Sequence, residues 1–161
     1  MLKLKFRLLV AAVALAPCGY ALAAADMVAE MDYCTKASVF AEVFTNGKLA
    51  QKSNDDSVAS AVAALNATYK DKISEQDLKL LLPWAVMVDK LRGYQPTTGG
   101  ALVAISCFTF LKDGKYLQMG SPSVIASVRA MLDACETHAS ADAVGQCIKP
   151  RYIALPLDNE K

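Results

Sequence analysis

The sequence is poor in the residues on which many enzyme mechanisms depend. His138 is the only histidine, so any mechanism based on an imidazole must use that one side chain. No serine stands in a Gly-x-Ser-x-Gly elbow, the pattern that exposes the nucleophile of many hydrolases. We therefore interpret His138 as a structural residue near the end of a helix, where a partly positive imidazole interacts favourably with the helix dipole.

Motifs for cofactors and metals are lacking as well. Gly99-Gly100 belongs to neither of the glycine-rich phosphate-binding patterns, and no Cys-x-x-Cys-His is present for covalent haem. Cys135 and His138 stand three positions apart, but no second such pair follows to complete a four-ligand zinc site. We therefore expect no cofactor and no metal site, and we expect that the protein is not an enzyme.

What the sequence does contain is an N-terminal segment, residues 1–25, with the pattern of a cleavable secretory signal peptide. Three basic residues precede the nine-residue apolar run 8–16, which is too short to span a membrane. Small residues then suit cleavage before Ala24 or before Asp26. This pattern predicts export, to the bacterial periplasm or to the outside of the cell.

A second N-terminal pattern concerns Cys18. Residues 15–18 resemble the lipobox of bacterial lipoproteins, in which the cysteine becomes the acylated first residue. That pattern has Gly, Ala or Ser directly before the cysteine, whereas this chain has Pro17. We therefore do not expect the protein to be a lipoprotein.

Removal of residues 1–25 changes the charge balance. The whole chain has 17 Lys and Arg against 16 Asp and Glu, whereas residues 26–161 retain 14 bases and all 16 acids, a net charge of −2. No run of like charge exceeds two residues, so neither nucleic acid nor an anionic membrane surface is expected as a partner. The most apolar later stretch, 101–111, has 11 residues. A transmembrane helix needs about 20, so the mature chain is expected to have none.

Four cysteines follow the signal segment: Cys34, Cys107, Cys135 and Cys147. An even number in an exported chain predicts two disulfides. Cys34 and Cys135 fall on the apolar stripes of two predicted helices near opposite ends of the chain. This phase favours Cys34–Cys135 with Cys107–Cys147. The alternative is Cys34–Cys107 with Cys135–Cys147, in which the second bond clasps a short helical hairpin.

Helical periodicity predicts one all-α domain of five or six helices over 26–150, followed by an extended tail, 151–161. The first helix is expected over 26–46, with Asn46-Gly47 as a left-handed cap. The second follows the capping residues 53–56.

The third predicted helix begins at Ser74, with Asp77 as its capping-box partner, and runs to about Arg92. Its apolar phase continues across Pro83, which predicts a kink and not two separate helices. The glycines and the proline of 93–100 predict a loop.

The stretch 101–119 is the ambiguous part of the sequence. It reads either as a buried helix capped by Gly114, which we favour, or as a β-hairpin turning at Asp113-Gly114. Beyond it, Ser121-Pro122 predicts the start of a helix that runs to about His138. Ser140 predicts a further short helix, which ends near Ile148 because Pro150 stops it.

Three aromatic residues are the candidates for a protein-binding surface. Trp84 stands beside Pro83, Tyr94 in the predicted loop 93–100, and Tyr116 in the next turn region. Tyr and Trp are enriched at binding hot spots, and an aromatic side chain held on a loop suits protein recognition. The structural alternative is that Trp84 fills the space around the kink and that the two tyrosines cap the core.

These observations predict a non-catalytic periplasmic or secreted protein that acts by binding another protein of the same compartment. In its signal peptide, size, helicity and cysteines, the chain resembles the small exported helical immunity proteins that neutralise cell-wall amidases delivered by type VI secretion. That resemblance implies an inhibitor with one partner. Two alternatives stay open: a periplasmic chaperone or envelope-assembly factor with many clients, and a hydrolase that relies on His138.

Overall fold

The computed structural model describes residues 29–70, 72–91, 93–138 and 140–159. The predicted signal peptide, its cleavage sites and Cys18 lie outside the described residues and stay predictions. The chain divides after Tyr33 into two compact units, and the contacts reported below all lie within the second, Cys34–Lys161.

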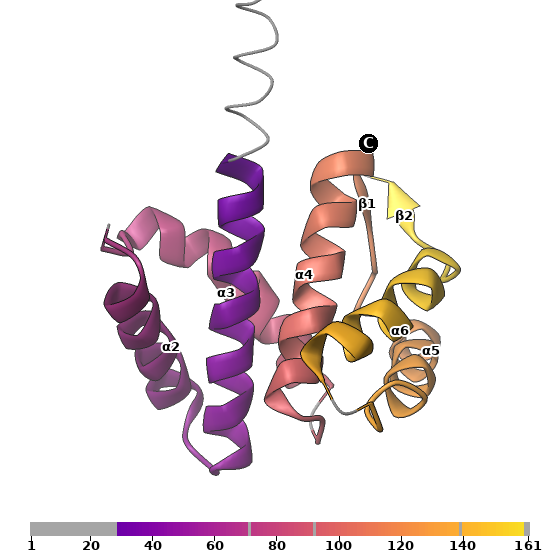
Figure 1. The fold of residues 1–161 in the computed structure, drawn as a ribbon, viewed down its shortest axis with the longest axis horizontal. Coiled ribbons are helices and arrows are strands. Elements are labelled where there is room, and N and C mark those ends of the chain that lie inside the picture. The colour runs from indigo at the N-terminus through magenta and orange to yellow at the C-terminus, as the bar shows by residue number, and fades with distance from the viewer. Residues whose placement is uncertain (1–28, 71, 92, 139, 160–161) are drawn as a thin grey trace, which may run out of the picture. The chain divides into compact units, whose positions relative to one another are not determined.

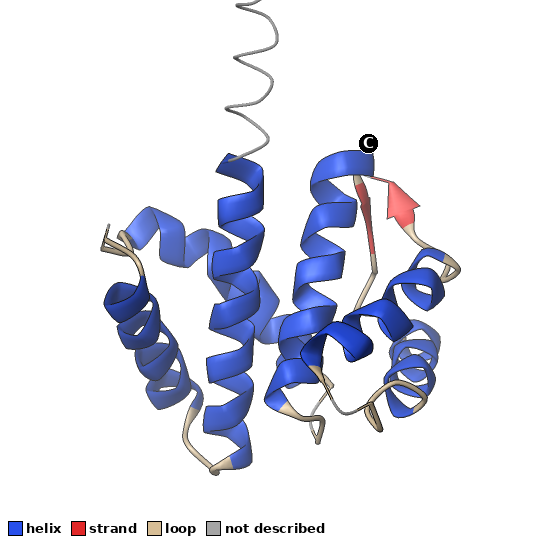
Figure 2. Cartoon of the chain, viewed as in Figure 1, coloured by secondary structure: helices blue, strands red, loops and turns tan. Residues whose placement is uncertain are grey.

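The described residues form six helices and one pair of short strands, which confirms the all-α prediction (Figures 1 and 2). The strands pair antiparallel, with Lys115 opposite Asn159 and Tyr116 opposite Asp158. No helix in this part of the chain is long and apolar enough to cross a membrane. The elements are α1 (29–49), α2 (Asn54–Thr68), α3 (Glu75–Asp89), α4 (Pro96–Asp113), β1 (Lys115–Tyr116), α5 (Pro122–Asp133), α6 (Ala141–Ile153) and β2 (Asp158–Asn159).

The starts of α2 and α3 are set by short-range hydrogen bonds, as the sequence predicts. Ser53 Oγ accepts from the backbone N–H of Asp56 at 3.1 Å. Ser74 Oγ accepts from the N–H of Asp77 at 3.1 Å, and the Asp77 carboxylate accepts from the N–H of Ser74 at 2.9 Å. Hydrogen bonds from Ser74 also lower the pKa of Asp77. As predicted, α3 continues through Pro83 as a single helix.

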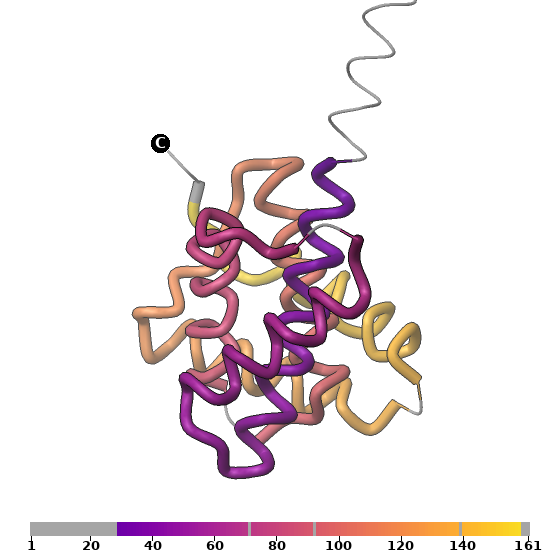
Figure 3. Tube along the Cα trace, turned by 90° about the vertical axis from the view of Figure 1, so that its left-hand side faces the viewer, coloured from indigo at the N-terminus to yellow at the C-terminus, as the bar shows by residue number. Residues whose placement is uncertain are grey.

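The predicted end of the first helix is wrong. α1 continues through Asn46-Gly47 to residue 49, and the positive φ, 59°, occurs at Gln51. Gly47 is buried, and a Cβ added to it would lie 2.7 Å from Ser57 Oγ. The glycine therefore allows α1 and α2 to pack closely, and α2 lies beside α1 in Figure 1 and crosses in front of it in Figure 3.

The predicted loop 93–100 is helical from Pro96 onwards, which is a second correction. Pro96 occupies the first turn of α4, where a missing N–H costs no helical hydrogen bond. Gly99 and Gly100 are buried. Ser38 Oγ donates to the carbonyl of Gly100 at 2.9 Å, and a Cβ on Gly100 would lie 3.3 Å from the carbonyl of Ser38. These glycines permit a close helix contact and do not form a turn.

The ambiguous stretch after residue 100 is resolved as a helix. α4 extends to Asp113, and Gly114 follows it as a left-handed cap with φ 62°, as in the favoured prediction. The hairpin alternative is wrong, because the two-residue strand β1 pairs with the C-terminal Asp158–Asn159.

Two predicted boundaries near the C-terminus are also wrong. α5 ends at Asp133 and not near His138. α6 continues past Pro150 to Ile153, so the first part of the predicted tail 151–161 is helical. Tyr152 is fully buried in this last turn. Burial of a large side chain is worth about 1.5–3 kcal/mol, which offsets much of the cost of a proline in a helix.

The favoured disulfide pairing is wrong, and the alternative is correct. Cys34 bonds to Cys107, and Cys135 bonds to Cys147. Cys34, Cys107 and Cys135 all have an exposed fraction of 0%, so the predicted inward direction of Cys34 and Cys135 is confirmed. However, helical phase does not determine which helix an inward side chain meets. The first bond joins α1 to α4, and the second clasps the connection between α5 and α6.

Candidate functional site: a groove between α4 and α6

Tyr94, one of the three predicted contact residues, is a buried anchor of the fold. It is 7% exposed, and its hydroxyl donates to the Asp133 carboxylate at 2.8 Å. Burial, assisted by this hydrogen bond, raises the pKa of Tyr94 to about 12. Nearby, the guanidinium of Arg129 donates to the carbonyl of Lys90 at 3.0 Å. These bonds fix the connection between α3 and α4 onto α5, so Tyr94 presents little surface to a partner.

The other two predicted aromatic residues lie on separate elements. Trp84 is half-buried on α3, beside Pro83. Tyr116 is on β1, opposite Asp158, with 37% of its surface exposed. The structure therefore does not place the three aromatic residues on a common element, and Tyr116 and Trp84 stay predictions as contact residues.

His138 is exposed in the turn that follows α5, where its backbone N–H donates to the carbonyl of Cys135 at 3.3 Å. Within the described ranges, no serine or carboxylate forms a hydrogen bond with its imidazole. The four cysteines of those ranges are all in disulfides, and the same residues contain no group of three or more His, Cys, Asp or Glu arranged to hold a metal ion.

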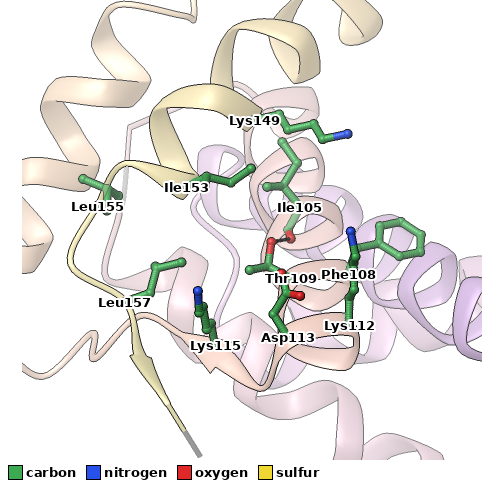
Figure 4. A pocket seen from close by; sticks show the side chains of 10 residues that line it. All are labelled: Ile105, Phe108, Thr109, Lys112, Asp113, Lys115, Lys149, Ile153, Leu155 and Leu157. Atoms are coloured by element: carbon green, nitrogen blue, oxygen red, sulfur yellow. Dashed lines mark hydrogen bonds between the residues drawn. The ribbon is translucent and has the colours of Figure 1, made fainter.

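The surface feature with the clearest chemical character is a cavity of about 510 Å³ that we call the α4–α6 groove (Figure 4). One wall is the C-terminal half of α4, and the other is the end of α6 with the segment that follows it. β1 contributes to one end. The residues that line it are Ile105, Phe108, Thr109, Lys112, Asp113, Lys115, Lys149, Ile153, Leu155 and Leu157.

Half of the residues that line the groove have apolar side chains. Ile153, at the end of α6, and Leu157, from the segment that follows it, point toward the face of α4 that carries Ile105 (Figure 4). Phe108 is 39% exposed and Ile153 is 58% exposed. Thr109 adds little polarity, because its hydroxyl donates to the carbonyl of Ile105 at 2.8 Å. Large apolar side chains left in contact with water at a hollow are typical of interaction surfaces.

Three lysines accompany this apolar surface. Lys112, Lys115 and Lys149 line the groove together with a single acid, Asp113. Within the part of the chain that the structure describes, none of the three lysines forms a salt bridge. The groove thus carries three positive charges and one negative charge, although residues 26–161 as a whole have a net charge of −2. This local excess of positive charge favours an anionic ligand.

A second hollow of about 440 Å³, which we call the acidic extension, continues the groove toward the N-terminal half of α4. The two hollows share Ile105, Phe108 and Lys149. The lining of the acidic extension includes Glu42 from α1 and Asp142 from α6. The combined surface therefore has Lys112 and Lys115 at one end and Glu42 and Asp142 at the other, with apolar side chains between them and Lys149 shared by the two hollows.

Sequence reasoning missed this groove. The signal that could have found it is the spacing of Ile105, Phe108 and Lys112, which places all three on one face of a helix. The opposite wall, however, includes Ile153, which the sequence assigned to an extended tail. Comparison with protein-family models gave no match, and comparisons with curated proteins and with solved structures found no similar chain.

Proposed function

We propose that this chain is a non-catalytic protein of the periplasm or another extracytoplasmic compartment that acts by binding another protein. In this proposal, the α4–α6 groove receives an apolar segment of the partner that also carries acidic side chains. The observation that carries the proposal is the combination of exposed apolar side chains with three lysines that form no salt bridge in the described residues.

The energetics of the groove support a protein contact. Burying the exposed parts of Phe108 and Ile153 is worth about 1 kcal/mol each, because complete burial of such a side chain is worth about 1.5–3 kcal/mol. Carboxylates that approach Lys112, Lys115 and Lys149 would add selectivity and a faster association rate. A centre of apolar contact with charge at its rim is the usual anatomy of a protein interface.

The compartment is supported by the disulfides and by the sequence. Two disulfides are typical of proteins that work in oxidising compartments, and residues 1–25 have the pattern of an export signal. An inhibitor or immunity-type protein, as the resemblance above implies, is one form of this function. It requires a single partner held at a defined surface.

The experiment compares two matched surface variants of the full, oxidised protein. Ile153 in the groove is 58% exposed, and Val86 on α3 is 56% exposed. Each is replaced by aspartate, and the proteins that copurify with each variant from the oxidising compartment are quantified. We expect Ile153→Asp to lose one stoichiometric partner and Val86→Asp to retain it.

Other outcomes would redirect the proposal. Loss of the partner only in Val86→Asp would move the contact to α3, the helix that carries Trp84, and would overturn the assignment of the groove. Many substoichiometric clients in both variants would favour the chaperone alternative. No partner in either variant, or in the unsubstituted protein, would overturn protein binding as the function.

A further inference from the structure

We infer that the partner segment is an amphipathic α-helix of about four turns with its charges separated, acids at one end and bases at the other. This inference rests on the proposed function, because it describes the occupant of the same groove. Three features of the α4–α6 groove and its acidic extension support it: their length along α4, the nature of their walls, and the order of their charges.

The length of the surface follows from α4. Its lining residues from α4 recur every three or four positions, three times as adjacent pairs, so they form one continuous stripe on a single helix face. From 97 to 113 this stripe extends for about 24 Å at 1.5 Å per residue, which corresponds to about four turns of an opposing helix. The residues of the stripe are Thr97, Ala101, Ala104, Ile105, Phe108, Thr109, Lys112 and Asp113.

The walls of the surface favour a helix over an extended segment. α4 and α6 form its two sides along most of its length, and a helix can lay an apolar face into such a groove, with side chains at i, i+3, i+4 and i+7 as anchors. An extended segment is usually bound by adding a strand to a sheet edge. Here β1 and β2 have two residues each, too few to hold such a strand.

The middle of the surface accommodates large side chains of the partner. Ala101 and Ala104 line the acidic extension beside Phe108. Small residues at these two positions leave room for bulky apolar side chains to enter between α4 and α6. The partner helix is therefore expected to present its largest apolar residues near its centre.

The charges determine which ends of the partner are acidic and basic. Lys112 and Lys115 lie with Asp113 at the C-terminal end of the surface, a net charge of +1. Glu42 and Asp142 lie with Lys149 in the acidic extension, a net charge of −1. Neither of these acids forms a salt bridge with any described residue. A helix with acids at one end and bases at the other can satisfy both ends at once. A helix of uniform charge would place like charges together at one end.

Synthetic peptides provide a direct test with the oxidised full-length protein. Two peptides of about 16 residues, long enough for four helical turns, have identical composition and the same apolar stripe. One has its Glu and Lys residues separated into opposite ends, and the other has them interleaved. We expect the separated peptide to bind at least about tenfold more tightly in calorimetric titration, with an advantage that decreases as salt is added.

Charge reversal in the protein locates the effect. Lys112→Glu is expected to weaken the binding of the separated peptide by about tenfold and to change the binding of the interleaved peptide little. The matched control is Lys79→Glu on α3, where Lys79 is exposed and pairs with Glu75 at 2.8 Å. This control is expected to leave both affinities unchanged.

The possible outcomes separate this inference from the proposed function. Equal binding of both peptides, abolished by Ile153→Asp, would overturn charge separation and leave the groove as a protein-binding site. Binding of neither peptide would overturn the helical occupant, and the paired Ile153 and Val86 variants would still decide whether a protein binds there. Saturable binding of palmitate in place of the peptides would make the groove a lipid site and would overturn both.

Discussion

Replacing Cys34 and Cys107 together by alanine should destabilise the protein more than the same replacement at Cys135 and Cys147. The first disulfide joins residues 73 apart and the second joins residues 12 apart. In the chain-entropy model, closing these loops restricts the unfolded chain by about 4.4 and about 2.8 kcal/mol. The expected difference in the free energy of unfolding is therefore about 1.6 kcal/mol, before any change in packing.

Packing increases this difference. Cys34 and Cys107 are both fully buried between α1 and α4, whereas Cys147 is 9% exposed. Removal of two buried sulfur atoms leaves a void that the surrounding side chains fill only in part, which adds to the cost at the first disulfide. Urea unfolding followed by circular dichroism measures both free energies. An equal or larger loss at Cys135 and Cys147 would refute this reasoning.

The expected stabilities of these variants depend on the observed disulfide connectivity. A tryptic digest under non-reducing conditions tests that connectivity. Trypsin does not cleave between Lys149 and Pro150, so Cys135 and Cys147 stay in one peptide, 130–151. The observed pairing predicts that this peptide is separate and carries an internal bond, while the peptide containing Cys34 is linked to 93–112. Under the other pairing, with Cys34 bonded to Cys135, a single product would contain all three peptides.

Three further predictions concern packing, hydrogen bonding and pH. Gly47→Ala should destabilise the protein by about 1–3 kcal/mol, because its Cβ would lie 2.7 Å from Ser57 Oγ. Gly145→Ala should stabilise α6 by about 0.5–1 kcal/mol, because its Cβ would meet nothing within 4 Å; destabilisation of both variants in thermal melts would contradict the packing argument. Tyr94→Phe should cost about 1–3 kcal/mol because Tyr94 donates to a charged carboxylate. Tyr152→Phe should cost less, because no hydrogen bond of normal geometry joins that buried hydroxyl to a described residue. Folding raises the pKa of Tyr94 from 10.0 to about 12, so the contribution of Tyr94 to stability is complete below pH 10 and is lost as the pH rises to 12. In urea unfolding measured across this pH range, the free energy of unfolding should fall less steeply with pH for Tyr94→Phe than for the unsubstituted protein. An equal dependence on pH in the two proteins would contradict the role given to Tyr94.

The sequence predicts those parts of the fold that depend on neighbouring residues. The caps of α2 and α3 depend on Ser53, Ser74 and Asp77, whose hydrogen bonds join residues three positions apart. Gly114 ends α4 through its own left-handed backbone conformation. Both kinds of signal work over one helical turn, and they are therefore visible in a single stretch of sequence.

Local signals fail where a tertiary contact opposes them. The local sequences around Gly47 and Gly100 are typical of a helix cap and of a loop. Both glycines nevertheless lie inside helices, because another helix approaches them closely. Pro150 should stop α6, yet the helix continues until Tyr152 is buried. In each case, packing against residues distant in sequence outweighs the conformational preference of the local sequence.

The sequence by itself determined that this protein is all-α, that its four described cysteines form disulfides, and that Cys34 and Cys135 face inward. Only the tertiary structure decided that Cys34 meets Cys107, because periodicity gives the buried face of a helix and not the neighbour that covers it. The same holds for the α4–α6 groove. Phe108 and Ile153 are 45 positions apart in the sequence, and they line one surface because α4 and α6 pack together.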